Sequence, residues 1–294
     1  MNKLVFVILL ITTTGLMGSS FAVGKIGLEY VSPLMLVGVR FTIAGILMAL
    51  AVRLLKRPHP TEAKEWGKVV LVGSLQTAGV MGSIFLSLRT ITAGESSILT
   101  FTNPLLVVVF GTLFMGMQYR RLQWLGVIMG IVGVFITLGA SLDIREVGFF
   151  LGLLSAVFWA SATLVMKKWG HSFDTWVLTA YQMLFGGLIL LVTSVLFEQV
   201  RLDLTSTSIG IILWLAIMAS SVQFAIWFYL LKKEDPAKVS SFLFLAPLFG
   251  VISGWLLLDE QLHLTTLTGG SIILLGIYLV NKPQKKKGQL EHTA

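Results

Sequence analysis

Apolar residues occur in ten long runs along the chain, and charged residues, Pro and Gly gather in the short stretches between them. A helix needs about 20 apolar residues to cross a bilayer, and the runs come close to that length. They are continuous and lack the alternation of membrane strands, so they predict helices. We therefore predict an all-α membrane protein with ten transmembrane helices. The predicted crossings are 4–24, 34–55, 67–88, 95–116, 122–141, 147–167, 175–197, 208–231, 237–258 and 263–281.

The composition is that of a protein that lies mostly inside the bilayer. Of the 294 residues, 55% are hydrophobic and 12% are charged, and the mean hydropathy is +0.88. A soluble domain has about 25% charged residues, so this chain has too few to cover a surface in water. The first apolar run imitates a secretory signal, but nine further runs follow it, and we interpret it as the first membrane helix. No separate soluble domain is expected.

Positive charges lie mainly at one set of helix ends. With ten crossings, 17 of the 22 Lys and Arg residues fall on one side and four on the other, while Arg40 lies within a helix. Cytoplasmic loops of membrane proteins are enriched in Lys and Arg, so this split places both termini in the cytoplasm. The net charge of +8 follows from these loops, and no nucleic acid partner is expected. We predict a multi-pass protein of a bacterial inner membrane.

The two halves of the chain repeat each other. Gly and Pro residues recur in register at offsets of 142 and 143 residues. Each half has five predicted helices, an odd number, so the halves must cross the membrane in opposite directions. Inverted repeats are typical of alternating-access transporters, whose site lies near the midplane between the halves. We predict two inverted five-helix repeats, at 1–141 and 147–282, and a basic cytoplasmic tail at 283–294. Matching pairs include Gly45 and Gly187, Pro104 and Pro247, Gly126 and Gly269, and Gly133 and Gly276.

Several motifs occupy ordered places in both halves. They are Gly18–Phe21 in the first helix, Arg40 in the second, Asn103-Pro104-Leu105 in the fourth and Ala246-Pro247-Leu248 in the ninth. With them the whole chain resembles the drug/metabolite transporter superfamily, in its ten-helix branch with paired EamA-type domains. The resemblance implies that both repeats are EamA-type domains and that the protein works in efflux.

Two positions depart from the pattern of that family. Its members often have a Glu after the Pro-containing helix of each half; Glu260 holds this position in the second half, whereas Met117 holds it in the first. Where the family has Trp-Gly in the first helix, this chain has Met17-Gly18. The sixth helix has the Trp, as Trp159, followed by Ala160.

Arg40 is the sharpest candidate for a substrate contact. It follows Pro33 by seven residues, about 10 Å along a helix, and therefore lies inside the outer part of the bilayer. A charge at that depth is costly and usually faces a protein interior or a water-filled cavity. We interpret it as a fixed positive charge for a substrate carboxylate or phosphate. Snorkelling to the headgroups and a tie to backbone carbonyls are the alternatives.

Further polar and aromatic side chains at membrane depth complete the candidate site. Buried amides either face a cavity or join helices by hydrogen bonds worth about 0.6 kcal/mol. A Trp either forms a cavity wall or anchors the protein at the membrane interface. As a set these residues are sufficient to make a midplane cavity polar. Besides Arg40, the predicted substrate-binding residues are Gln76, Asn103, Trp159, Tyr181, Gln182 and Gln223.

Pro104 and Pro247 interrupt the hydrogen-bond ladder of the fourth and ninth crossings. The carbonyl four residues earlier loses its donor, and in a membrane it must find another partner or face a cavity. Because the break recurs in both halves, we predict that the two prolines are gating hinges or line the site. A static packing kink is the alternative.

Titratable groups are scarce at membrane depth. Every Asp and Glu lies at or near a helix end or in a loop, and the four His residues lie outside the crossings. Proton-coupled carriers normally use a titratable group within the membrane, so facilitated diffusion or exchange is favoured over a deep proton relay. Glu95, at the outer start of the fourth crossing, is the candidate proton site, with an interfacial role as its alternative. The sequence has no Cys, P-loop or metal-ligand cluster, so we expect no cofactor, no metal site and no enzyme activity.

These observations predict a secondary transporter, an exporter or exchanger, that moves small metabolites such as amino acids or related amphipathic compounds by alternating access. The direction and the substrate class are implied by the resemblance alone. A passive channel and a membrane-embedded enzyme acting on a lipid are the alternatives. The expected partners are a small-molecule substrate and the lipid bilayer, and homo-oligomer formation is left open.

Overall fold

The regular structure of the chain is helical. The computed structural model describes residues 2–137, 147–234, 239 and 242–281. Within them the helices are accompanied by one isolated β-bridge, between Val31 and Leu202. In the described part of the chain, eight helices are long and apolar enough to cross a membrane, and two shorter apolar helices lie at the fifth and ninth predicted crossings. The prediction of an all-α membrane protein is confirmed.

The first repeat contains five crossings, two of which are interrupted. The third contains a π-helical segment, and the fourth is broken at Phe101 and Thr102. The helices are α1 (Lys3–Gly27), α2 (Pro33–Leu54), α3 (Ala63–Val72), η1 (Gly73–Gly79), α4 (Val80–Ser87), α5 (Ala93–Thr100), α6 (Asn103–Met115) and α7 (Arg121–Thr137).

The second repeat follows the same plan. Its third crossing again contains a π-helical segment, η3, at the place that corresponds to η1. The predicted basic tail, 283–294, lies outside the described residues. The helices are α8 (Val147–Trp169), the short η2 (Gly170–Ser172), α9 (Thr175–Phe197), α10 (Ser206–Ala216), η3 (Ile217–Val222), α11 (Gln223–Lys233), α13 (Leu245–Leu258) and α14 (Leu264–Asn281).

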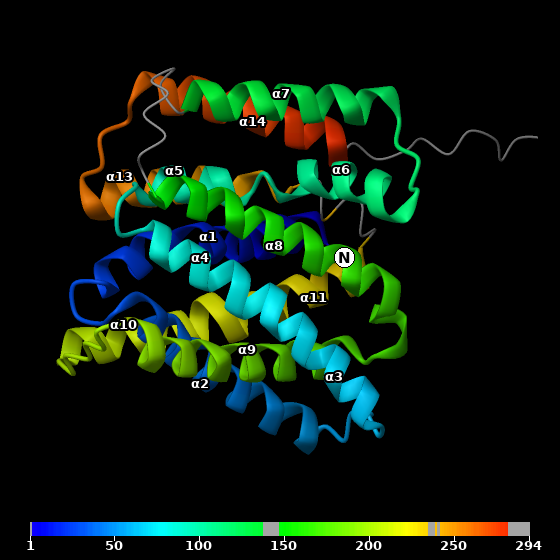
Figure 1. Ribbon diagram of the computed structural model, residues 1–294, viewed down its shortest axis with the longest axis vertical. Coiled ribbons are helices and arrows are strands. Elements are labelled where there is room, and N and C mark those ends of the chain that lie inside the picture. The colour runs from blue at the N-terminus through cyan, green and yellow to red at the C-terminus, as the bar shows by residue number, and fades with distance from the viewer. Residues whose placement is uncertain (1, 138–146, 235–238, 240–241, 282–294) are drawn as a thin grey trace, which may run out of the picture.

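The packing of the helices also shows the duplication. The helix α2 packs along its counterpart α9, and α7 packs along its counterpart α14. Figure 1 shows these two pairs at opposite ends of the long axis, with helices such as α1, α5, α8 and α11 between them. The contact of α1 with α13 is matched by the contact of α8 with α5 and α6, which is the same pairing with the repeats exchanged. Equivalent helices of the two repeats therefore make equivalent contacts with each other.

Glycines allow the α2–α9 pair to pack at close range. A Cβ at Gly45 would overlap the backbone of Leu184, and a Cβ at Gly187 would overlap the backbone of Thr42. Small residues let the backbones of membrane helices approach, which replaces the hydrophobic driving force that is absent in lipid. The outward faces of the bundle present large apolar side chains such as Leu113 and Phe197. An apolar surface of this kind is expected for a protein surrounded by lipid.

The prolines begin new helical segments rather than kink continuous helices. The helix α5 ends at Thr100 and α6 begins at Asn103, so Pro104 lies in the first turn of α6. The carbonyl of Thr100, four residues before the proline, accepts a hydrogen bond from Asn103 Nδ2 at 3.3 Å. Pro247 is the third residue of α13. The hinge role of both prolines stays a prediction.

Candidate functional site

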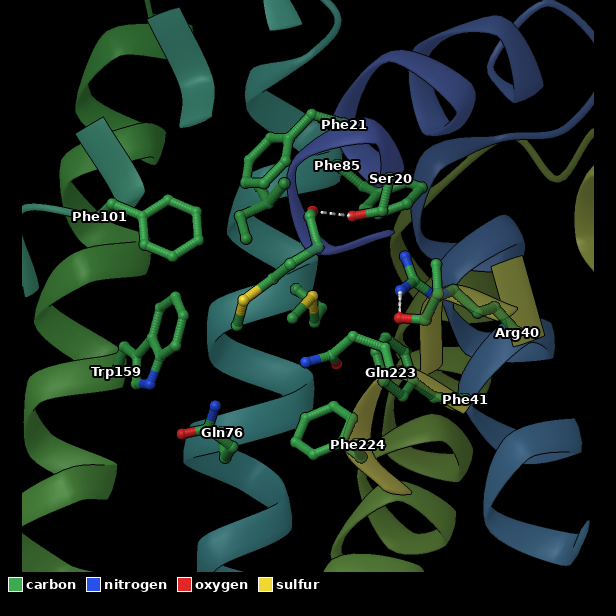
Figure 2. Close-up of a pocket in the computed structure, with 14 residues that line it drawn as sticks. Ser20, Phe21, Arg40, Phe41, Gln76, Phe85, Phe101, Trp159, Gln223 and Phe224 are labelled. Carbon is green, nitrogen blue, oxygen red and sulfur yellow. Dashed lines mark hydrogen bonds between the residues drawn. The ribbon is translucent and has the colours of Figure 1, made fainter. Parts of the chain in front are cut away.

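A cavity lies between the two repeats, and both contribute to its walls. Its lining comes from α1, α2, η1, α4 and Phe101 in the first repeat, and from α8, η3 and α11 in the second. It contains about 530 Å³ of empty space with its opening counted. Four predicted site residues line it, and Figure 2 shows them around one space: Arg40, Gln76, Trp159 and Gln223.

Arg40 lies buried at the wall of this cavity. The residue is 2% exposed. Its Nε donates to Ser220 Oγ at 2.9 Å, and its Nη2 donates to the carbonyl of Ala219 at 2.9 Å. The guanidinium also lies 4.7 Å from the ring centroid of Phe41 and 5.9 Å from that of Phe85. This burial leaves no exposed route for snorkelling, whereas the predicted tie to a backbone carbonyl is present.

The charge of Arg40 is not neutralised by the residues that the structure describes. None of the ion pairs found among them involves Arg40. The Nη1 atom is buried and has no hydrogen-bond partner in the same part of the chain. A buried charge without a counterion carries a large desolvation cost. This corner of the cavity therefore favours a negatively charged ligand group.

Two amides reach the cavity from the third crossing of each repeat. Gln76 belongs to η1, and Gln223 directly follows η3. The Nε2 of Gln223 donates to Thr13 Oγ1 at 3.3 Å, while Gln76 Oε1 is buried without a partner among the described residues. A π-helical turn holds an extra residue and shifts the side chains that follow it, and such turns are frequent at functional sites. Both amides therefore take their places from a local irregularity of the helix.

Aromatic rings form most of the remaining wall. Trp159 lies 5.3 Å from Phe101 between ring centroids, and Phe101 lies 6.3 Å from Phe21. Figure 2 shows Trp159 and Phe101 on the side of the cavity that faces away from Arg40. Trp159 thus has the predicted position of a cavity wall rather than that of an interface anchor.

Three predicted site residues do not line this cavity. Asn103 bonds to the carbonyl of Thr100, as described above. Gln182 joins two crossings, since its Oε1 accepts from Thr77 Oγ1 at 2.7 Å. Tyr181 accepts from Arg53 Nε at 3.2 Å and packs against Trp66, with 4.8 Å between ring centroids. Their contacts are those of residues that join helices.

Glu95 caps a helix. Its Oε2 accepts from the backbone N–H of Thr92 at 3.0 Å and from Thr92 Oγ1 at 2.9 Å, while its own N–H donates to Thr92 Oγ1 at 3.0 Å. This is a capping box at the start of α5. Glu95 does not line the cavity, and its role as a proton site stays a prediction.

Comparison with known proteins defines the family. The model of the EamA-like transporter family matches residues 4–139 and again residues 146–282. The chain belongs to the EamA-like transporter family. It is therefore a membrane transporter with a duplicated architecture, as the packing of its repeats indicates.

Relatives of this family member occur in bacteria and plants. The uncharacterized transporter YvbV of Bacillus subtilis (strain 168) is 30% identical over 272 residues, which cover 91% of this chain and 88% of YvbV. The inner membrane transporter YedA of Escherichia coli (strain K12) is 28% identical over 90% of this chain and 86% of its own. The WAT1-related protein At3g02690 of Arabidopsis thaliana is 28% identical over 91% of this chain and 67% of its own. A solved protein structure shares the fold, with a TM-score of 0.67 and 19% identity over 93% of this chain and 96% of its own.

The family's glutamate position has a defined role in this structure. Glu260 Oε1 pairs with Lys25 Nζ at 3.0 Å and accepts from the N–H of Ala93 at 2.7 Å, and Oε2 accepts from the N–H of Gly94 at 3.3 Å. The carboxylate thus joins the end of α1 to the first turn of α5, where the helix dipole favours negative charge. In the other repeat the equivalent residues, Lys167 and Met117, meet at 3.6 Å between Nζ and Sδ.

Sequence reasoning missed much of the cavity lining. Phe41, Met81 and Phe85 line it, yet they are apolar residues among many apolar residues, and no pattern separates them from lipid-facing positions. Ser20 could have been predicted from the sequence, because it belongs to the Gly18–Phe21 motif. For the Lys25–Glu260 pair the sequence offered one signal, the position at which the family often has a glutamate. The two residues are 235 positions apart, so no local pattern connects them.

Proposed function

We propose that this EamA-family protein is a secondary transporter that exports or exchanges small metabolites, such as amino acids or related amphipathic compounds, by alternating access. The cavity between the repeats is its binding site. The observation that carries the proposal is Arg40, a buried charge at the wall of a cavity to which both repeats contribute.

The arrangement of the repeats supports alternating access. Transporters built from inverted repeats bind substrate between the repeats and expose it to either side as one repeat moves against the other. Here the cavity is lined by both repeats, and a broken crossing, α5–α6, contributes Phe101 at its break. Motion at that break would change the wall of the site directly.

The charge distribution supports a placement in a bacterial inner membrane with both termini in the cytoplasm. The ends rich in Lys and Arg would then face the cytoplasm. We expect reporter fusions at Pro58 and Gly170 to report a cytoplasmic location and a fusion at Asp203 to report an outer one. The reverse pattern would contradict this orientation and leave the binding site unaffected.

Counterflow in proteoliposomes tests the transport proposal. The purified protein is reconstituted, the vesicles are loaded with amino acids, organic acids, nucleosides, sugars or cationic drugs in turn, and uptake of the labelled compound is followed. We expect saturable uptake that is accelerated by the same compound inside the vesicles. Flux that rises linearly with concentration and shows no acceleration from inside would indicate a channel. Release of lipid products without any flux would indicate an enzyme.

A further inference from the structure

The chemistry of the cavity restricts the substrate class, an inference that rests on the proposed function. Arg40 is the one charged side chain among the described residues that line the cavity. Its guanidinium donates hydrogen bonds to Ser220 and to the carbonyl of Ala219, while Nη1 has no partner in the described part of the chain. A planar guanidinium with free donors matches a carboxylate. The positive charge and the lack of a carboxylate on the described lining both disfavour organic cations.

The opposite side of the cavity has a different character. Figure 2 shows Phe101 and Trp159 across the space from Arg40, with Gln76 beside Trp159. Rings of this kind bury an apolar or aromatic group, and they gain further from offset or edge-to-face contact. Gln76 has a buried amide oxygen without a partner among the described residues, so it can accept a hydrogen bond from a donor group of the ligand at that end.

We propose that the cavity takes amphipathic organic anions. The carboxylate of the ligand lies at Arg40, and its aromatic or branched apolar body lies against Phe101 and Trp159. The charge and the ring contribute independently, because they contact opposite walls of the cavity.

Four matched probes separate the two contributions: phenylpropionate, its neutral amide, the cationic phenylpropylamine, and propionate, which lacks the ring. Binding to the purified full-length protein in nanodiscs is measured by calorimetry. We expect phenylpropionate to bind at least about tenfold more tightly than its amide, since a hydrogen bond to a charged group is lost in the amide. We expect a similar loss for propionate, since the ring is no longer buried. The amine should bind more weakly than the amide.

Variants of the residues on each wall of the cavity test which wall causes each binding preference. Arg40→Gln should abolish the preference for the acid over the amide, and Arg40→Lys should retain part of it. Trp159→Ala should reduce the preference for phenylpropionate over propionate and keep the preference for acid over amide. Arg53→Gln is the matched control, because Arg53 lies on the same helix and does not line the cavity. It should leave both preferences unchanged.

The outcomes distinguish this inference from the proposed function. Equal binding of acid and amide, absence of binding by the acid, or tighter binding of the amine would overturn the inference. Counterflow of a neutral or cationic compound that depends on the cavity residues would do the same, while the transport proposal would stand. Selective binding of the acid without counterflow of any compound would support the inference and contradict the transport proposal.

Discussion

At the scale of single residues, most buried polar groups in this protein have hydrogen-bond partners. Five buried side-chain atoms of the described residues lack one, and two of the five, Arg40 Nη1 and Gln76 Oε1, belong to the cavity. A buried polar atom without a partner costs about 1–3 kcal/mol. Such a cost is recovered when a ligand supplies the missing group, which links these two residues to binding.

Gln182 is expected to stabilise the fold without contacting substrate. Its hydrogen bond to Thr77 joins α9 to η1. We expect Gln182→Leu and Thr77→Val to be coupled by about 0.6 kcal/mol in a double-mutant cycle of thermal unfolding, with the KM for transport unchanged. Gln223→Leu is the comparison, because Gln223 lines the cavity and its loss should raise the KM. A tenfold rise of KM in Gln182→Leu with normal stability would assign Gln182 to the site.

Transport is expected to run down the substrate gradient. The described lining of the cavity contains no Asp, Glu or His, and amides and hydroxyls do not titrate near neutral pH. We expect an imposed pH gradient to cause little accumulation in vesicles. Glu95→Gln should leave exchange unchanged, because Gln can also form the capping box, whereas Glu95→Ala should lower stability by roughly 1 kcal/mol. Strong accumulation driven by pH and abolished by Glu95→Gln would identify Glu95 as the proton site.

At the scale of helices, local irregularities add residues to a site that is otherwise lined from regular helices. The π-helical segments η1 and η3 place Gln76 and Gln223 at the cavity, and the break between α5 and α6 places Phe101 there. The regular helices α2, α9, α7 and α14 form the two close-packed pairs. Each repeat thus combines rigid packing with interrupted helices at the site.

The α2–α9 pair gives a matched test of glycine packing. A Cβ at Gly45 would lie 2.5 Å from the backbone nitrogen of Leu184, whereas a Cβ at Gly15 would meet nothing within 4 Å. We expect Gly45→Ala to lower the free energy of unfolding by about 1–3 kcal/mol through overpacking. Gly15→Ala should raise it by up to about 1 kcal/mol, because Ala favours the helix. Thermal unfolding of both variants checks the sign, and equal shifts would contradict the close packing.

At the scale of the whole molecule, the two repeats are alike in packing but differ in charge. The Lys25–Glu260 ion pair joins α1 to the start of α5 at one end of the bundle. At the equivalent place at the other end Lys167 contacts Met117, and no ion pair of Lys167 is found among the described residues. These two equivalent places therefore differ, although Arg57 and Asp174 form a separate ion pair between the repeats at the Lys167 end, at 3.4 Å. We expect the difference to bias which side the cavity opens to.

Changes at the two carboxylate positions should both shift that bias toward opening at the Lys25 end. Glu260→Gln removes the ion pair and should favour opening at the Lys25 end. Met117→Glu places a carboxylate near Lys167 and should favour closure at the Lys167 end, by several-fold at most because Lys167 is exposed. The chain has no Cys, so a cysteine at Ser20 reports access to the cavity through labelling from each side. Met117→Gln is the uncharged control, and equal labelling in all variants would contradict the bias.

Local patterns in the sequence predict the helical fold, the approximate positions of the crossings and the duplication, because apolar length, charge and Pro or Gly positions are visible in the chain. The sequence also indicated Arg40, Gln76, Trp159 and Gln223, since charged, amide and indole groups at membrane depth are conspicuous. Packing between the helices separates these residues from Asn103, Tyr181 and Gln182, which are also polar groups at membrane depth but do not line the cavity. The π-helical turns, the aromatic wall and the ion pair across 235 residues were likewise decided by packing between distant segments, which no local pattern records.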